Sequence, residues 1–188
     1  MNLENQENQE NLLYRYLKSS HIKDSICWSK VCSAVEIENA TPETFIHEAA
    51  FDLRPQEQDI SFFNSTHKNE TGRILDVLNE LRFRRSGGGF SARSGVMKID
   101  YITAQEDLND IREVIRFEDN DRYVRSCRHF GLQIFASTDL DRLETVNALI
   151  ELSSFFALKK TSGNPDKRDI LQLTEQGKFF ELAHNTPI

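Results

Sequence analysis

The charged segment from Lys159 to Arg168 carries the side chains best suited to chemistry in this chain. It reads KKTSGNPDKR, with basic residues on either side of a turn-forming Ser-Gly-Asn-Pro stretch. Lysine and arginine bind phosphate oxygens, and the arginine guanidinium can do so through two parallel hydrogen bonds. The segment therefore predicts contact with a nucleic acid or with an acidic protein. Its charged members are Lys159, Lys160, Lys167 and Arg168, with Asp166 as the one acid.

A second basic segment, RFRRSGGGFSARSGVMK, runs from Arg82 to Lys98 without any acid. Its glycines would let a phosphate approach the backbone, and its arginines supply donors. Two interpretations remain open, a flexible connector and a mobile basic arm on which Phe83 or Phe90 could stack bases. The candidate nucleic-acid contacts here are Arg84, Arg85 and Arg93.

Composition limits the classes of protein to consider. The chain has 188 residues, 38% of them hydrophobic and 28% charged, which is enough to bury a core. The net charge of −7 argues against a broad, non-specific nucleic-acid binder. Residues 1–70 hold twelve acids and six bases, a balance of −6, so the rest of the chain carries only −1 and can hold local basic patches.

The cysteines and histidines indicate no metal centre and no cofactor. Cys27, Cys32 and Cys127 form an odd set without a second Cys-x4-Cys pair, which is typical of reduced thiols in the cytoplasm. No histidine has ligand spacing to a cysteine pair. No apolar run approaches the ~18 residues of a membrane span, so no membrane association is expected.

The hydrophobic pattern predicts a flexible tail at 1–10, an α+β region at 11–102 and a second domain at 103–188. In the α+β region we expect helices near 11–19, 41–51 and 70–83, and strands at 59–63 and 96–102. Leu13, Tyr16 and Leu17 place the first helix, and Thr41 with Pro42 begins the second. The arginines Arg122, Arg125 and Arg128 would share a helix surface.

From residue 103 the pattern predicts helix, helix, short strand, helix, hairpin, helix. The first apolar stripe is Leu108, Ile111, Val114 and Ile115. Ser137 or Thr138 caps a helix whose apolar face is Leu140, Leu143, Val146 and Ile150. Strands at 155–161 and 169–173 form the hairpin, and Thr174 caps a final helix containing Phe179, Phe180 and Leu182.

This order and the segment from Ala148 to Leu182 resemble MarR-type winged-helix regulators. The wing of that family runs Asp-x-Arg, then a short strand, then Leu-Thr-x-x-Gly; the matching residues are Asp166, Arg168, Leu173, Thr174 and Gly177. The resemblance implies that Arg168 enters the DNA minor groove, oriented by Asp166, with Lys159, Lys160 and Lys167 near phosphates. It also implies a recognition helix carrying Arg142 and Asn147 and leaves a homodimer open. The predicted fold is α+β, an N-terminal α+β region followed by a C-terminal winged-helix module.

The predicted function is that of a DNA-binding regulator or accessory factor acting on double-stranded DNA. The alternative is an adaptor that binds another protein through its acidic recognition helix, which carries Asp139, Asp141 and Glu144. An enzyme acting on a phosphorylated substrate is a third interpretation, with Arg82–Arg85 as the phosphate site. No catalytic residue is predicted, because nothing fixes the acids Glu48, Asp52, Asp59 and Asp100 at a catalytic spacing.

Overall fold

A computed structural model describes most of the chain and places its strands in one antiparallel sheet. The described residues are 11–23, 28, 31, 37, 39–53, 56–84, 90–124, 127–164 and 166–187, without the side chains of 83, 84 and 121–124. Eight strands of this part follow the order β4-β5-β2-β1-β3-β6-β7-β8. Their bounds are β1 Leu12–Leu17, β2 Ile60–Ser65, β3 Arg93–Asp100, β4 Ile115–Val124, β5 Cys127–Ile134, β6 Ser154–Lys160, β7 Lys167–Leu173 and β8 Phe179–Pro187.

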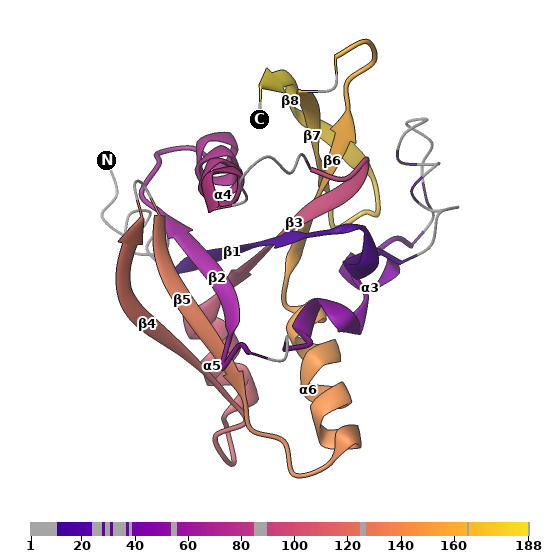
Figure 1. Ribbon diagram of the computed structural model, residues 1–188. Helices are drawn as coiled ribbons and strands as arrows, with labels where there is room; N and C mark the ends of the chain where they lie inside the picture. The colour runs from indigo at the N-terminus through magenta and orange to yellow at the C-terminus, as the bar shows by residue number, and fades with distance from the viewer. Residues whose placement is uncertain are drawn as a thin grey trace, which may run out of the picture.

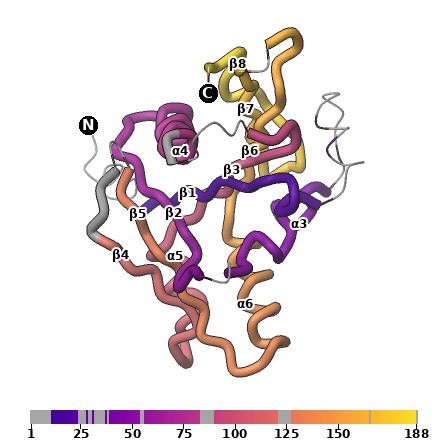
Figure 2. Tube along the Cα trace, in the orientation of Figure 1, coloured from indigo at the N-terminus to yellow at the C-terminus, as the bar shows by residue number. Residues whose placement is uncertain are grey.

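The helices cover both faces of this twisted sheet (Figures 1 and 2). One face packs against α4, and the opposite face packs against α3, α5 and α6. The helical elements are η1 Ser19–His21, α3 Pro42–Phe45, η2 Glu48–Phe51, α4 Glu70–Arg84, α5 Tyr101–Leu108 and α6 Asp139–Glu151. No helix of the described part is long and apolar enough to cross a membrane.

The central strands are buried on both faces, which explains how the core is divided. In β1, Leu13 and Leu17 belong to the core under α3, α5 and α6, whereas Tyr14 and Tyr16 belong to the core under α4. Successive side chains of a strand point to opposite faces, so one short strand can contribute side chains to both cores. Large fully buried side chains of both cores include Phe45, Phe51, Phe62, Phe155, Phe156, Ile74 and Leu78.

A polar cluster ties the first turn of α4 to the sheet. The Tyr14 hydroxyl donates to Glu70 Oε1 at 2.6 Å, and Lys98 Nζ lies 2.9 Å from Glu70 Oε2. Burial, together with the nearby Glu70 carboxylate, raises the pKa of Tyr14 above its ordinary value. The hydroxyl therefore keeps its proton and remains a donor to Glu70.

The predicted fold class is wrong: the chain is a mostly-β protein, and it contains no winged-helix module within the described residues. A winged helix buries its core between helices, but here α6 packs on a sheet through Val146, Leu149 and Ile150. Strands from before and after residue 103 pair directly, β2 with β5 and β3 with β6. The two predicted regions therefore share one sheet.

The final helix of the resemblance is replaced by strand β8. Thr174 does not cap a helix: its amide donates to the Lys178 carbonyl at 2.8 Å, and its hydroxyl accepts from the Lys178 amide at 3.2 Å. These bonds close a tight turn between β7 and β8, in which Gly177 has φ +74°. The Leu-Thr-x-x-Gly pattern thus makes a β-hairpin turn, because β7 offers an open edge with which the following residues pair.

Two other predicted helices are also strands or loops. Residues 12–17 form β1, since a strand buried on both faces shows no alternation and can imitate helical spacing. The stripe through Leu108, Ile111, Val114 and Ile115 divides between the end of α5, a loop and the start of β4, and Ile111 is 95% exposed. Arg128 lies on β5 rather than on a helix, and residue 125 lies outside the described residues.

Several predicted elements are confirmed. The helix begun by Thr41 and Pro42 is α3, the helix at 70–83 is α4, and Thr138 caps α6 through the Asp141 amide. The strands predicted at 59–63, 155–161 and 169–173 correspond to β2, β6 and β7. The expected flexible tail at 1–10 and the glycine run at 87–89 lie outside the described residues.

Gly177 and Gly163 provide a paired test of this fold, because both have positive φ but only Gly177 is crowded. An added Cβ at Gly177 would lie 2.8 Å from the Ala40 amide nitrogen, whereas at Gly163 nothing lies within 4 Å. We expect Gly163→Ala to lower the free energy of unfolding by about 1 kcal/mol, the cost of a left-handed non-glycine residue. Gly177→Ala should cost at least 1 kcal/mol more, measured by urea unfolding. Equal losses would contradict the packing of the β7–β8 turn against Ile37 and Ala40.

Candidate functional site

The predicted phosphate contacts on three strands gather at one end of the sheet. Arg93 begins β3, Lys159 and Lys160 end β6, and Lys167 and Arg168 begin β7. Antiparallel pairing brings these strand ends together at the top of the molecule as drawn in Figure 1. We call Arg93, Lys159, Lys160, Lys167 and Arg168 the basic end. The sequence predicted these residues separately, and the sheet register brings them together.

Like charges face each other across two neighbouring pairs of the basic end. Arg93 is the direct cross-strand partner of Lys159, and Lys160 is the direct partner of Arg168. Directly opposed like charges destabilise a sheet, by roughly 0.2–1 kcal/mol per pair. Within the described part of the chain, Arg93, Lys159, Lys160 and Lys167 form no ion pair that would offset this repulsion. An anion bound at this end would remove that cost.

The two pairs present their charges on opposite faces of the β6–β7 ribbon. Lys160 and Arg168 lie on the face covered by α4, in line with Leu158 and Ile170 of that core. Arg93 and Lys159 lie on the other face. Positive charge therefore gathers on the α4 side of the ribbon end, whereas on the other side Asp169 lies directly opposite Lys159, and the turn carries the exposed Asp166.

Arg168 is not an exposed reader. Its side chain is buried, and the guanidinium donates to the carbonyl oxygens of Phe90 at 3.2 Å and Lys167 at 3.1 Å. These bonds fasten the start of β7 to the segment that leads into β3. Asp166 makes no described ion pair with Arg168, and its amide instead donates to Asn164 Oδ1 at 3.0 Å. Arg168 thus joins the start of β7 to Phe90 and is covered, whereas Lys160 is exposed and Lys159 and Lys167 are half-buried.

The remaining predicted contacts lie elsewhere or outside the described residues. Arg142 and Asn147 lie on α6, which is at the opposite end of the molecule from the β6–β7 turn (Figure 1). Asn147 is exposed there. Arg84 ends α4, but its side chain and all of residue 85 lie outside the described residues.

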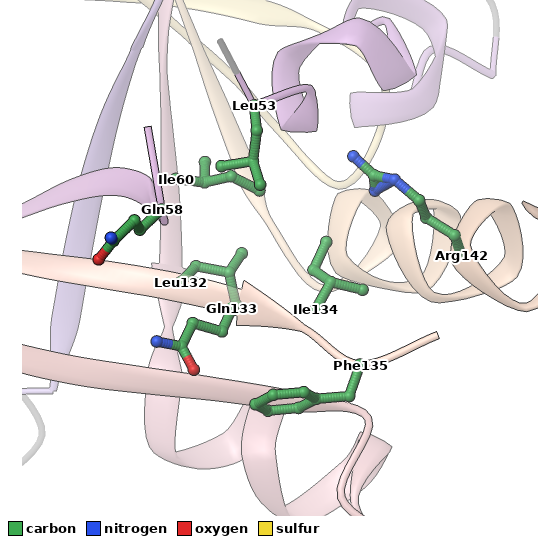
Figure 3. Close-up of a pocket in the computed structure, with 8 residues that line it drawn as sticks. All are labelled: Leu53, Gln58, Ile60, Leu132, Gln133, Ile134, Phe135 and Arg142. Atoms are coloured by element: carbon green, nitrogen blue, oxygen red, sulfur yellow. The ribbon is translucent and has the colours of Figure 1, made fainter. Parts of the chain in front are cut away.

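A pocket of about 330 Å³ opens beside α6, far from the basic end (Figure 3). Arg142 reaches from α6 toward it and donates to the Phe51 carbonyl at 2.6 Å, with Asp52 Oδ1 3.5 Å away. This contact holds η2 against the helix. The pocket is lined by Leu53, Gln58, Ile60, Leu132, Gln133, Ile134, Phe135 and Arg142.

Exposed apolar side chains lie on the wall of this pocket and on α6, and we call this end of the molecule the acidic end because it also holds acids of α5, α6 and the α5–β4 connection. Leu53 and Phe135 on the pocket wall are 49% and 39% exposed, and Leu140 and Leu143 on α6 are 63% and 43% exposed. The helices α5 and α6 and the α5–β4 connection lie at this end of the molecule (Figure 1). Their exposed acids that form no described ion pair are Glu106, Asp107, Asp110, Asp139, Glu144 and Glu151.

One acid of the acidic end is engaged by a strong local contact. Arg116 hydrogen-bonds to both carboxylate oxygens of Glu113, at 2.7 and 2.5 Å. That hydrogen bonding lowers the pKa of Glu113 and raises the pKa of Arg116. Arg116 also lies over the Phe135 ring, 5.2 Å from its centroid, so a cation covers part of the pocket wall.

A third group of side chains, which could ligate a metal ion, is not among the residues predicted from the sequence. Asp169, Glu181 and His184 bring their ligand atoms within 4.8 Å of one another on β7 and β8. No sequence pattern indicates this group, since residues three apart on a regular strand point to opposite faces. An irregularity in the β7–β8 pairing brings them to one side.

Comparison with known proteins identifies no relative of this chain. No family model matches the chain, and no curated protein or solved structure does so either. The geometry described above is therefore the basis for inferring function.

The contrast between Arg168 and Lys160 can be tested through stability. Arg168→Ala removes a donor to Phe90 and the buried stem of the side chain, so we expect a loss of about 1–3 kcal/mol in the free energy of unfolding. Lys160→Ala, at an exposed position, should change it by less than about 0.5 kcal/mol. Chemical denaturation of both variants measures this. Equal effects would show that Arg168 does not support the basic end.

Proposed function

We propose that this protein is a nucleic-acid-binding accessory protein that contacts the phosphate backbone of double-stranded DNA through its basic end. The observation that carries the proposal is the gathering of Arg93, Lys159, Lys160 and Lys167 at one end of the sheet, where Arg93 and Lys159 are like-charge cross-strand partners. Phosphates between such side chains would turn a repulsive arrangement into a favourable one. A cytoplasmic location, expected from the cysteine usage, is part of the proposal.

The position of the β6–β7 turn supports a contact with the phosphate backbone. The turn lies at the end of the sheet with Lys160 and Lys167 at its base, while β6 also pairs with β3 and β7 also pairs with β8. Phosphate contacts fix the position of a protein on a duplex but do not read its sequence. The acidic end lies away from the ribbon (Figure 1), so its repulsion of DNA acts over a long distance and is screened by salt.

Fluorescence anisotropy on a mixed-sequence duplex tests the proposal across a salt series. We expect measurable binding at low salt that weakens steeply as salt rises, because counterions are released from the DNA. In Lys160→Glu/Lys167→Glu the binding should collapse, and the slope of log K against log salt should fall by about 1 for each lysine removed. Lys160 is exposed, and Arg168 contacts Lys167 through its backbone carbonyl, which the substitution leaves in place, so the fold should be retained.

The matched control is Lys23→Glu/Lys68→Glu, which makes the same change in net charge outside the basic end. It should bind the duplex nearly as the wild type does. An equal loss in both double variants would reduce the effect to overall charge, and no binding at low salt would refute the proposal. Stronger binding to a single strand than to the duplex would move the proposal to single-stranded nucleic acid.

The pocket at the acidic end favours a second candidate function, that of an adaptor for another protein. Leu53 and Phe135 are exposed on the cavity wall and Leu140 and Leu143 on α6. Several exposed acids of the acidic end form no described ion pair, whereas Asp141 is paired with Arg112. Exposed apolar side chains with a charged rim are typical of protein-binding surfaces. Charge complementarity selects the occupant: an amphipathic helix with leucine anchors and flanking lysines.

A synthetic amphipathic Leu/Lys helix serves as the probe for this second candidate. We expect binding by the wild-type protein, and a loss of at least tenfold in affinity in Leu140→Ser/Leu143→Ser, measured by anisotropy of the labelled peptide. Leu152→Ser, at the other end of α6, is the matched control because Leu152 is also exposed, at 38%. Equal binding of a Leu/Glu peptide, or equal binding by the double variant, would refute the docking surface.

A further inference from the structure

We propose that Asp169, Glu181 and His184 form a binding site for a divalent first-row metal ion of the Zn²⁺ type. The inference is independent of the proposed function, since no residue of the basic end is one of the proposed ligands. His184 Nδ1 lies 2.9 Å from Asp169 Oδ1 and 3.5 Å from Glu181 Oε2. All three ligand atoms lie within 4.8 Å of one another.

These separations are those of atoms around a shared metal ion. Zinc binds nitrogen and carboxylate oxygen at about 2.0–2.2 Å. Neighbouring ligands at that radius lie roughly 2.9–3.6 Å apart in octahedral and tetrahedral geometries. The two distances from His184 fall in this range, and only a small movement of the exposed Glu181 is needed to complete the set.

The backbone is arranged to bring the three side chains to one side. Pairing of β7 with β8 is irregular between Arg168 and Ile170 and again between Ile170 and Leu171. Glu181 and His184 therefore both face Asp169, as they would not on a regular strand. Bulges of this kind re-aim side chains and are common beside functional sites.

Asp169 is held in place by the groups around it. Its side chain is only 10% exposed, and Oδ1 accepts from the Asn185 amide at 3.0 Å and from the Thr161 hydroxyl at 3.2 Å. Asn185 has φ 54°, which turns its amide toward the carboxylate. Hydrogen bonds to a ligating carboxylate fix its orientation and support metal binding.

Charge also favours a cation at this place. Two carboxylates meet a single imidazole, and among the described residues no lysine or arginine forms an ion pair with Asp169 or Glu181. Lys159 is the cross-strand partner of Asp169 but makes no described ion pair with it. A bound divalent ion would balance the two negative charges.

The donor set indicates the class of metal. Imidazole with carboxylates suits Zn²⁺, Co²⁺ or Mn²⁺, whereas Mg²⁺ and Ca²⁺ prefer oxygen ligands alone. Three protein ligands leave at least one coordination position open to water. Cys127 is buried in the α4 core, and its thiol belongs to a different part of the molecule.

Calorimetric titration of the full chain with Zn²⁺, and separately with Mg²⁺, tests the site. We expect about one Zn²⁺ per chain and at least tenfold weaker binding of Mg²⁺. His184→Gln and Glu181→Gln should each weaken Zn²⁺ binding at least tenfold. These side chains are 62% and 54% exposed, so both variants should fold, as circular dichroism will verify.

The matched control is His47→Gln, since His47 Nδ1 also lies near a carboxylate, 3.4 Å from Glu48 Oε2, but in a pair rather than a triad. Zn²⁺ binding should be unchanged in this variant. The absorption spectrum of the Co²⁺ form should lack a thiolate charge-transfer band. Absence of stoichiometric binding, retention of binding in both site variants, or a thiolate band would each overturn the proposal.

Discussion

The structure depends on one constraint: the central strands are apolar on both faces and must be covered on both. β1 and β3 lie in the middle of the sheet, where Leu13 and Met97 face one core and Tyr14 and Val96 face the other. A sheet of this kind is stable only with helices on each side. α4 covers one face alone, and α3, α5 and α6 divide the other. The basic residues of β6 and β7 are thereby displaced to the ends of these strands.

That displacement explains the distribution of charge. Basic residues collect where β3, β6 and β7 meet their connections, because the apolar residues of the same strands occupy the covered middle. The acids of α6 and of the α5–β4 connection lie at the far end. The molecule thus presents two surfaces of opposite character, one suited to phosphates and one suited to a basic, amphipathic partner. An accessory factor that joins a nucleic acid to a protein could use both.

The β7–β8 hairpin adds a different kind of feature at an outer strand. An outer strand has neighbours on one side only, so an irregular pairing there disturbs little of the sheet. The irregularity places Glu181 and His184 beside the nearly buried Asp169. This group adjoins the basic end, since Asp169 follows Arg168 in the chain and is the cross-strand partner of Lys159, while its hydrogen bonds are to Thr161 and Asn185.

Local signals in the sequence determined several elements of this protein. The Thr41-Pro42 start of α3, the apolar spacing of α4 and the Thr138 cap of α6 were readable, because capping and helical periodicity depend on neighbouring residues. The strands β6 and β7 and their basic residues could also be predicted, because their apolar runs are local features of the sequence. The pairing partners of the strands could not be predicted, since sheet hydrogen bonds join residues far apart in the chain.

Only the tertiary structure decided the rest. It made residues 12–17 a central strand, because burial on both faces overrides an apparent helical spacing. It extended the hairpin into β8 rather than a helix, because the open edge of β7 needed a partner. The register of β3, β6 and β7 brought Arg93, Lys159, Lys160 and Arg168 together, and the β7–β8 bulge assembled a group for which the sequence has no motif. Long-range pairing, which no local pattern encodes, is the physical reason for each of these outcomes.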